Sequence, residues 1–176
     1  STTGVPVGAT TGTFPIAASD PAYQYDTNPN TIRATTMKIE IPRYPSIATS
    51  ATCLPLGPIA YALNGVAIFN GIDGEGRDAV AHEIQDSCSG HPERTGMYHY
   101  HSGSKCIAAK AKGTSVLIGY ALDGFGIYRE TGAKGRALTN ADLDACHGRT
   151  STVTFNGKSQ RIYHYVVTAE YPYTLG

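Results

Sequence analysis

Two stretches with the same order of apolar and turn-forming residues dominate the pattern of the chain. Residues 59–69 (IAYALNGVAIF) and 118–128 (IGYALDGFGIY) each place an Asn-Gly or Asp-Gly pair between two apolar arms. Such a pair is a strong signal for a β-hairpin, because its residues tolerate the positive φ of tight turns. The two stretches are identical at six of their eleven positions. We therefore predict two hairpins of the same design.

The similarity continues downstream of both stretches. Residues 86–90 (DSCSG) have a counterpart in residues 144–148 (DACHG), at nearly the same distance from the preceding hairpin. The Tyr-His-Tyr sequence of residues 98–100 likewise recurs at residues 163–165. Three matches in one order indicate two copies of a unit that contains a hairpin, a short helical connector, an Asp-x-Cys-x-Gly motif and a Tyr-His-Tyr strand.

The pattern as a whole predicts a mainly β fold with a few short helices. We place the two pseudo-repeated units at about residues 59–106 and 118–176 and expect them to share one core within a single domain of residues 32–176. Alternation over residues 32–41 predicts a further strand that ends at a proline. Residues 1–31 contain several prolines and turn-forming residues and predict an extended N-terminal arm.

The two connectors and one inserted turn refine this prediction. Ala79, Val80 and Ile84 have helix-like spacing in the first connector, and Thr139 is a candidate N-cap in the second. An Asn-Gly pair within residues 151–160 predicts another hairpin, which leads directly into the second Tyr-His-Tyr sequence. Both Tyr-His-Tyr sequences are therefore expected to be strands.

Strand geometry determines where the histidines point. Side chains two residues apart share a face, so His99 and His101 lie on one face and Tyr98 and Tyr100 on the other. Two imidazoles placed in this way can converge on one metal ion, which zinc sites hold at about 2.0–2.1 Å from each nitrogen. A third ligand must come from elsewhere in the fold.

Candidates for the further ligands come from both units. His91 directly follows the first Asp-x-Cys-x-Gly motif, and His164 belongs to the second Tyr-His-Tyr strand. We therefore predict a metal site formed by His91, His99 and His101, with His164 as a candidate fourth ligand. Imidazole ligands suit copper or zinc.

The neighbouring residues leave two interpretations open. Asp86 either anchors its own loop or orients a ligating imidazole. Tyr98 and Tyr100 either pack in the core or lie beside the metal. A His-x-His pair on a strand also occurs on protein surfaces or in a hydrogen-bonded polar core, without any metal. His82 lies on the first connector and is expected to be structural or exposed, whereas His147, next to Cys146, either interacts with a helix end or ligates a metal.

Composition and charge narrow the classes of function. The chain has 176 residues with 14 basic and 14 acidic side chains, and lacks a basic run, which argues against a nucleic-acid partner. No apolar run approaches the roughly 20 residues that span a bilayer. The four cysteines form no Cys-x-x-Cys pair, which favours disulfides over thiolate ligation. We expect a secreted protein, periplasmic or extracellular, whose signal peptide has been removed.

Several motifs together resemble a known family. Residues 86–101 (DSCSGHPERTGMYHYH), 118–128 (IGYALDGFGIY) and 163–176 (YHYVVTAEYPYTLG) are similar to the YHYH-domain proteins, most of which are bacterial and extracytoplasmic. The resemblance covers roughly residues 28–176. It implies an extracytoplasmic location and a metal role for the tetrapeptide, but no particular reaction.

The chain departs from the family pattern in its second unit. Arg149 and Val166 stand where the family usually has the final histidines of Asp-x-Cys-x-Gly-His and Tyr-His-Tyr-His. The resemblance therefore implies that the first unit carries most of the site, through the intact set His91, His99 and His101.

The resemblance also bears on the cysteines. It favours a disulfide between Cys88 and Cys106, which would hold the loop of His91 close to the strand of His99. Family members usually have another cysteine beyond the last residues of this sequence. Without it, Cys146 pairs with Cys53 or is unpaired.

Three hypotheses follow for the function. The first is a secreted domain that binds copper or zinc through the histidines of the Tyr-His-Tyr-His strand. The second is a metal-dependent enzyme at the same site, hydrolytic with zinc or oxidative with copper. The third is a non-enzymatic structural or binding module stabilised by disulfides. The sequence contains no nucleophile elbow and no His-Glu-x-x-His motif that would name a reaction.

Overall fold

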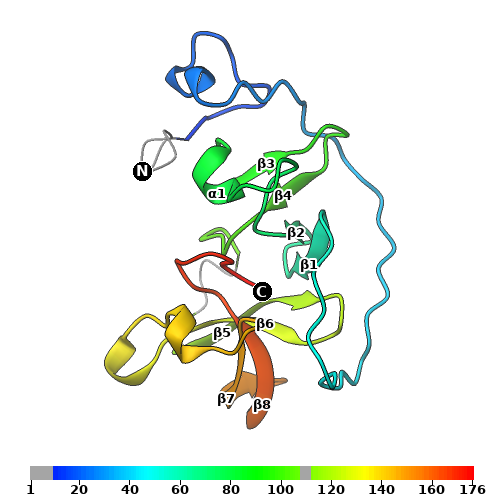
Figure 1. Ribbon diagram of the computed structural model, residues 1–176, viewed down its shortest axis with the longest axis vertical. Coiled ribbons are helices and arrows are strands. Elements are labelled where there is room, and N and C mark those ends of the chain that lie inside the picture. Colours follow the sequence, from blue (N-terminus) through cyan, green and yellow to red (C-terminus); the bar gives the residue numbers. More distant parts are fainter. Residues whose placement is uncertain (1–9, 108–111) are drawn as a thin grey trace.

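A computed structural model describes residues 10–107 and 112–176, which form one eight-stranded mixed sheet with short helices (Figure 1). The prediction of a mainly β fold with a few short helices is confirmed. The strands are β1 (Pro58–Ala62), β2 (Ala67–Phe69), β3 (Gly90–Pro92), β4 (Tyr98–Tyr100), β5 (Ser115–Ala121), β6 (Gly126–Glu130), β7 (Gly148–Phe155) and β8 (Lys158–Val166). The helical turns are η1 (Pro21–Gln24), α1 (Ala79–His82), η2 (Ala133–Gly135) and η3 (Asn140–Asp142).

The strand order is β3-β4-β2-β1-β5-β6-β8-β7. We call β3-β4-β2-β1 the first half of the sheet and β5-β6-β8-β7 the second half. The pairs β2–β4 and β6–β8 are parallel, and the other neighbouring strands are antiparallel. Each half therefore has the same order and directions of strands when it is followed outward from the centre.

The centre of the sheet is the antiparallel pair of β1 and β5. Tyr61 lies opposite Tyr120, and Ala62 lies opposite Gly119. A Cβ at Gly119 would come within 2.5 Å of the Tyr61 carbonyl oxygen, so the close approach of the two strands requires glycine there. Apolar side chains from both halves build the core around this pair; they include Ile59, Ile68, Ile118 and Ile127.

The three predicted hairpins all form, with two kinds of turn. Asn156 and Gly157 both have positive φ, as a two-residue type I′ turn requires. In the β1–β2 and β5–β6 turns it is the glycine, Gly65 or Gly124, that takes positive φ, at 84° and 94°. There the Asn or Asp keeps negative φ, because these loops are one residue longer than a type I′ turn.

The Asp-x-Cys-x-Gly motif builds a loop beneath the first tyrosine of the strand that follows. Asp86 Oδ1 accepts hydrogen bonds from the backbone N–H groups of Cys88 and Gly90, at 2.8 and 3.2 Å. The Tyr98 hydroxyl donates to both Asp86 oxygens, at 2.9 and 2.8 Å. A Cβ at Gly90 would lie 2.2 Å from the Tyr98 hydroxyl oxygen, so this position also requires glycine.

The second copy of the motif makes the same contacts. Asp144 Oδ1 accepts from the N–H groups of Cys146 and Gly148, at 3.0 and 2.9 Å, and Tyr163 donates to Asp144 Oδ2 at 2.9 Å. The residue types of the motif therefore follow from one local structure.

Two predicted elements differ from the structure. Residues 32–41 form no strand, although Ile39 and Ile41 alternate as predicted. The segment pairs with no strand of the sheet and both side chains are exposed, and alternation alone provides neither the backbone hydrogen bonds nor the burial that stabilise a strand. The first connector is helical over one turn only. Asp78 caps its N-terminus, and the helix ends at His82 because Glu83 adopts an extended conformation. Thr139 is the predicted N-cap of the second connector, where it forms a capping box with Asp142 around η3.

The N-terminal arm packs on the connector that follows α1. Ile16 and Ala22 of the arm form a small apolar cluster with Ile84. Asp26 Oδ2 accepts a hydrogen bond from the Ile84 N–H at 3.0 Å. The arm, drawn in blue in Figure 1, therefore lies against the β3–β4 end of the sheet.

One predicted disulfide is present and the other is not. Cys88 and Cys106 are bonded across a sequence separation of 18 residues, which encloses β3 and β4. Cys53 and Cys146 are free thiols, so of the two alternatives predicted for Cys146, a bridge to Cys53 or no partner, the second is observed. Cys53 is exposed on a segment without regular structure, whereas Cys146 packs against the core, so the two thiols lie in different environments.

Candidate metal centre

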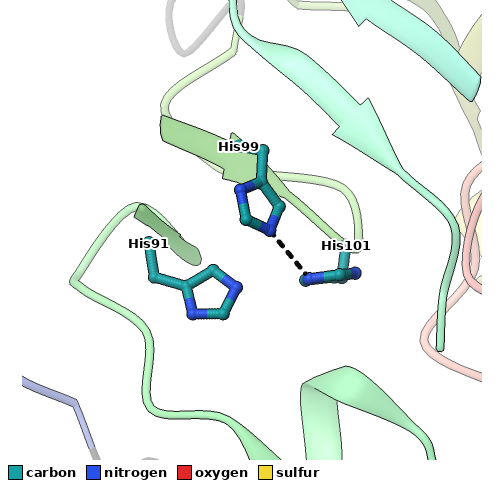
Figure 2. Close-up of side chains that lie close together, drawn as sticks. All are labelled: His91, His99 and His101. Atoms are coloured by element: carbon teal, nitrogen blue, oxygen red, sulfur yellow. Dashed lines mark hydrogen bonds between the residues drawn. The ribbon is translucent and has the colours of Figure 1, made fainter. Parts of the chain in front are cut away.

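Three buried histidines of the first half lie together. His91 comes from β3, His99 from β4, and His101 directly follows β4; Figure 2 shows the three rings pointing toward one another. One donor nitrogen from each ring lies within 4.8 Å of the donor nitrogens of the other two. Each of the three residues is only 2–3% exposed. Among the described residues, these three form the group that could hold a metal ion.

The strand register explains why the rings meet. His91 is the cross-strand partner of His99 in the antiparallel pair of β3 and β4. Directly opposite residues project to the same face, as do residues two apart on one strand, such as His99 and His101. Three histidines are therefore delivered to one face by a single hairpin.

Backbone carbonyl groups determine the protonation of two of the rings. His99 Nδ1 lies 3.2 Å from the Met97 carbonyl oxygen, and His101 Nδ1 lies 2.6 Å from that of Asn70. A carbonyl oxygen only accepts, so each Nδ1 must carry its hydrogen. In the neutral rings, each Nε2 then holds a lone pair.

These two lone pairs face each other. The Nε2 atoms of His99 and His101 are 3.0 Å apart, the contact that Figure 2 marks with a dashed line. Two unprotonated nitrogens repel at this distance, so the arrangement requires a shared cation, either a proton or a metal ion. A metal ion coordinated by both rings satisfies this requirement.

Burial keeps two of the rings, those of His91 and His99, neutral. Loss of hydration lowers the pKa of His91 to about 3, with a contribution from nearby His101. Burial, reinforced by the other two rings, lowers the pKa of His99 to about 2. Neutral imidazole is the form that binds metals.

The third ring has a different hydrogen-bonding partner. His91 Nδ1 lies 3.4 Å from Asn28 Nδ2, which also donates to the Pro92 carbonyl oxygen at 3.2 Å. An amide NH₂ group only donates, so His91 Nδ1 accepts and its ring hydrogen is on Nε2. Ligation through Nε2 would move that hydrogen to Nδ1, and Asn28 would then have to turn its amide oxygen toward the ring.

A carboxylate completes the cluster. Glu83 Oε2 lies 3.3 Å from His91 Nε2 and 3.2 Å from His101 Nε2. Both Glu83 Oε2 and His91 Nε2 are buried and have no aligned hydrogen-bond partner. Buried polar atoms without a partner are rare in native proteins and often mark a missing ion or water.

The cluster borders a cavity of about 620 Å³. The three histidines and Glu83 line it together with Asp26 and Asn28 of the N-terminal arm and residues of the β3–β4 turn. A ligand of moderate size bound in this cavity would therefore lie beside the cluster.

The remaining predicted site residues lie elsewhere. His164 is outside the three-histidine group, and its Nε2 lies 3.0 Å from Glu130 Oε2 in the second half. Asp86 contacts its own loop and Tyr98, and Tyr100 accepts a hydrogen bond from Asn64 at 3.1 Å. Burial and the Asp86 carboxylate raise the pKa of Tyr98, which keeps its hydroxyl protonated.

The two other histidines have structural contacts. His82 Nδ1 lies 3.0 Å from the Asp78 carbonyl oxygen, at the start of α1. His147 Nε2 contacts Asn140 and Thr168, at 2.9 and 3.1 Å, and burial lowers its pKa. These contacts agree with the structural alternative for each residue.

Sequence reasoning missed two side chains of the site, Glu83 and Asn28. Glu83 was assigned to a connector helix, but the helix ends one residue earlier and the extended backbone directs this side chain to the histidines. Asn28 belongs to the arm and lies 63 residues before its partner His91. Neither contact has a local signal, because each depends on how distant segments pack.

Comparison with known proteins agrees with the motifs. Searches among curated proteins and among solved structures found no significant match. The sequence model of one family, described as YHYH protein, matches residues 38–141, which is more than half of the chain and includes β1 to β6 and all three clustered histidines. The chain therefore belongs to the YHYH protein family.

Proposed function

We propose that the protein binds one transition-metal ion, copper or zinc, through His91, His99 and His101, and that it does so outside the cytoplasm. The proposal of a secreted, periplasmic or extracellular location is supported by the disulfide between Cys88 and Cys106, because such bonds persist in oxidising compartments. None of the helices in the described ranges has the length and apolarity to cross a membrane.

The observation that carries the metal proposal is the contact between His99 and His101. Their Nε2 atoms lie 3.0 Å apart, and each Nδ1 is committed to a carbonyl oxygen. Hydrogen bonds from Nδ1 to carbonyl oxygens are the usual support of metal-ligating histidines, because they fix the ring orientation and leave Nε2 free.

We also propose that the two halves of the sheet derive from one duplicated unit. The equal strand order of the halves and the shared contacts of the two Asp-x-Cys-x-Gly loops support this origin. In this view the first half kept its metal-binding histidines, whereas Arg149 and Val166 replaced two of them in the second half.

The test is the metal content of protein made without a histidine tag. The wild type, the double variant His99→Ala/His101→Ala and the control His164→Ala are each loaded with zinc or copper(II), desalted and analysed for metal. We expect about one ion per chain in the wild type and in His164→Ala, and none retained by the double variant. Loss of supporting contacts alone costs roughly 10–100-fold in metal affinity, so loss of two ligands should exceed this. Equal metal content in all three proteins would refute the proposal.

The cavity over the cluster favours a second candidate, a metal-dependent enzyme at the same site. A cavity of about 620 Å³ is within the size range of small-molecule sites, and it reaches all three histidines. When bound, zinc would supply an activated water and copper would supply redox chemistry. Hydrolysis of activated esters and phosphoesters by zinc-loaded protein, and oxidation of phenols by copper-loaded protein, would be compared with the double variant. Equal rates for the two proteins on every substrate would exclude these reactions.

A further inference from the structure

We propose that Glu83 is the fourth ligand of the metal centre, and that its carboxylate makes the centre selective for a divalent ion such as zinc over copper(I). This inference rests on the metal-binding function proposed above. It adds a residue from outside the YHYH strand, and it narrows the class of ion.

The distances around Glu83 are those of neighbouring ligands. Donor atoms at 2.0–2.1 Å from a tetrahedral ion lie about 3.3 Å from one another. Glu83 Oε2 lies 3.2 Å from His101 Nε2 and 3.3 Å from His91 Nε2. The Nε2 atoms of His99 and His101 are 3.0 Å apart. These three separations are close to that value, and the donor nitrogens of the three histidines, which lie within 4.8 Å of one another, would draw together around an ion.

Hydrogen bonding within the cluster does not satisfy the carboxylate. In the neutral ring, which is the form that binds a metal, His101 Nε2 carries no hydrogen, because its Nδ1 donates to the Asn70 carbonyl oxygen. The hydrogen on His91 Nε2 is not aligned with Glu83, and Glu83 Oε2 is buried without a hydrogen-bond partner. Leaving a buried acceptor unpaired is unfavourable, and more so for a charged group. A cation between the four side chains would remove this cost.

The backbone on both sides of Glu83 is held in place. On one side, the Glu83 N–H donates to the Ala79 carbonyl oxygen and closes α1. On the other side, Ile84 is fully buried, and its N–H donates to Asp26 of the N-terminal arm. The carboxylate is therefore positioned by a helix end and by the arm, as a ligand requires.

The carboxylate changes which ion the centre prefers. Three neutral imidazoles leave the full charge of a divalent ion uncompensated, whereas Glu83 neutralises one unit of it. Carboxylate oxygen is a hard donor, and copper(I) prefers soft sulfur ligands. Glu83 should therefore strengthen the binding of zinc much more than that of copper(I).

Glu83 also differs from the histidines in exposure. Its side chain is 27% exposed, compared with 4% for those of His91 and His101, and it borders the cavity. Of the proposed ligands it is therefore the one that water or another oxygen ligand can reach most easily.

The test compares Glu83→Gln and Glu83→Ala with the wild type. Glu75→Gln is the matched control, because it neutralises a carboxylate on a nearby turn whose side chain is 72% exposed. Affinities for zinc, and for copper(I) without oxygen, are measured by competition with chromophoric chelators. The visible spectrum of the cobalt(II) protein reports the ligand set. We expect both Glu83 variants to bind zinc about 10–100-fold more weakly than the wild type. Their cobalt(II) spectra should differ from that of the wild type, and their affinity for copper(I) should change little. Glu75→Gln should behave as the wild type.

The stability of the metal-free protein separates a ligand from a structural residue. Glu83→Gln should unfold at the same temperature as the wild type or higher, because it removes an unpaired charge, and zinc should raise its melting temperature less. If the metal-free variant is less stable and its affinity for zinc is normal, the carboxylate is structural and the proposal is wrong.

The two proposals fail in different ways. A wild-type affinity and cobalt spectrum in Glu83→Gln, together with no zinc binding by His99→Ala, would overturn the role of Glu83 and leave the histidine site intact. If the wild-type protein itself binds neither zinc nor copper, the metal-binding function fails and the role of Glu83 fails with it.

Discussion

His99 of β4 and His164 of β8 occupy equivalent places in the two halves of the sheet. His99 Nδ1 contacts the carbonyl oxygen two residues earlier, of Met97, at 3.2 Å, and His164 Nδ1 contacts that of Ile162 at 3.0 Å. On the edge strands, His91 lies opposite His99, and Arg149 lies opposite His164. The backbone therefore presents both rings in the same way.

The rings differ in what faces Nε2. His99 faces two further imidazoles, whereas His164 faces Glu130, whose other oxygen accepts a hydrogen bond from Ser151 at 2.7 Å. Val166 fills the place that corresponds to His101. The comparison indicates that the Tyr-His-Tyr strand presents its histidine in the same way in both halves, and that a few neighbouring side chains decide whether this ring joins a three-histidine cluster or contacts a carboxylate.

The largest expected difference between the halves is in the stability of the metal-free protein. His164 is fully buried, and the Glu130 side chain is 9% exposed, so His164→Ala leaves a cavity and removes one of the two partners of this buried carboxylate, Ser151 being the other. The lost packing and the lost contact together should cost about 3–5 kcal/mol. His99→Ala, by contrast, removes one of two facing lone pairs and should cost less. Denaturant unfolding in the presence of chelator measures the stability of both variants. A larger loss of stability in His99→Ala than in His164→Ala would contradict the comparison.

The disulfide should make the first half more sensitive to changes at cysteine. Cys88→Ala/Cys106→Ala should lower the free energy of unfolding by about 3 kcal/mol, because it opens a ring closed across 18 residues. Cys146→Ala, at the position that matches Cys88, removes only a half-buried thiol and should cost less than about 1 kcal/mol. Denaturant midpoints measure the stability of the two variants. If the cysteine double variant loses no more stability than Cys146→Ala, the disulfide adds no stability beyond that of a packed thiol.

Introducing histidines at positions 149 and 166 of the second half should have the smallest effect on the protein, and the effect should be confined to metal binding. Arg149→His/Val166→His places three imidazoles around the position of His164, with Glu130 already present. If strand register is sufficient, this variant should bind a second zinc ion, more weakly than the first because Val166 is fully buried and the larger ring must be accommodated. Zinc titration by calorimetry would show it. A folded variant that still binds a single ion would mean that strand register alone does not form a metal site, and that the site of the first half depends on further residues.

Some of these features were predictable from the sequence because their signals are local. The hairpins were marked by Asn-Gly and Asp-Gly, and the shared face of His99 and His101 followed from strand alternation. Candidate His91 was identified by its place after the Asp-x-Cys-x-Gly motif, without knowledge that it pairs with His99 across β3 and β4.

Other features depend on packing between distant segments. Alternation over residues 32–41 predicts a strand that does not form, because a strand also needs a neighbouring strand with free backbone N–H and C=O groups. Glu83 and Asn28 join the cluster only through the end of α1 and the packing of the arm. The environment of Cys53 likewise depends on an exposed segment that has no pattern of its own.

The disulfide has a consequence for how long a metal ion would stay bound. His91, His99 and His101 all lie inside the covalent ring closed by Cys88 and Cys106. When the short β3–β4 hairpin frays, the ring keeps the three imidazoles at a high effective concentration relative to one another. An ion released by one ring would therefore be recaptured before it diffuses away, and reduction of a single bond would speed its loss without changing any ligand.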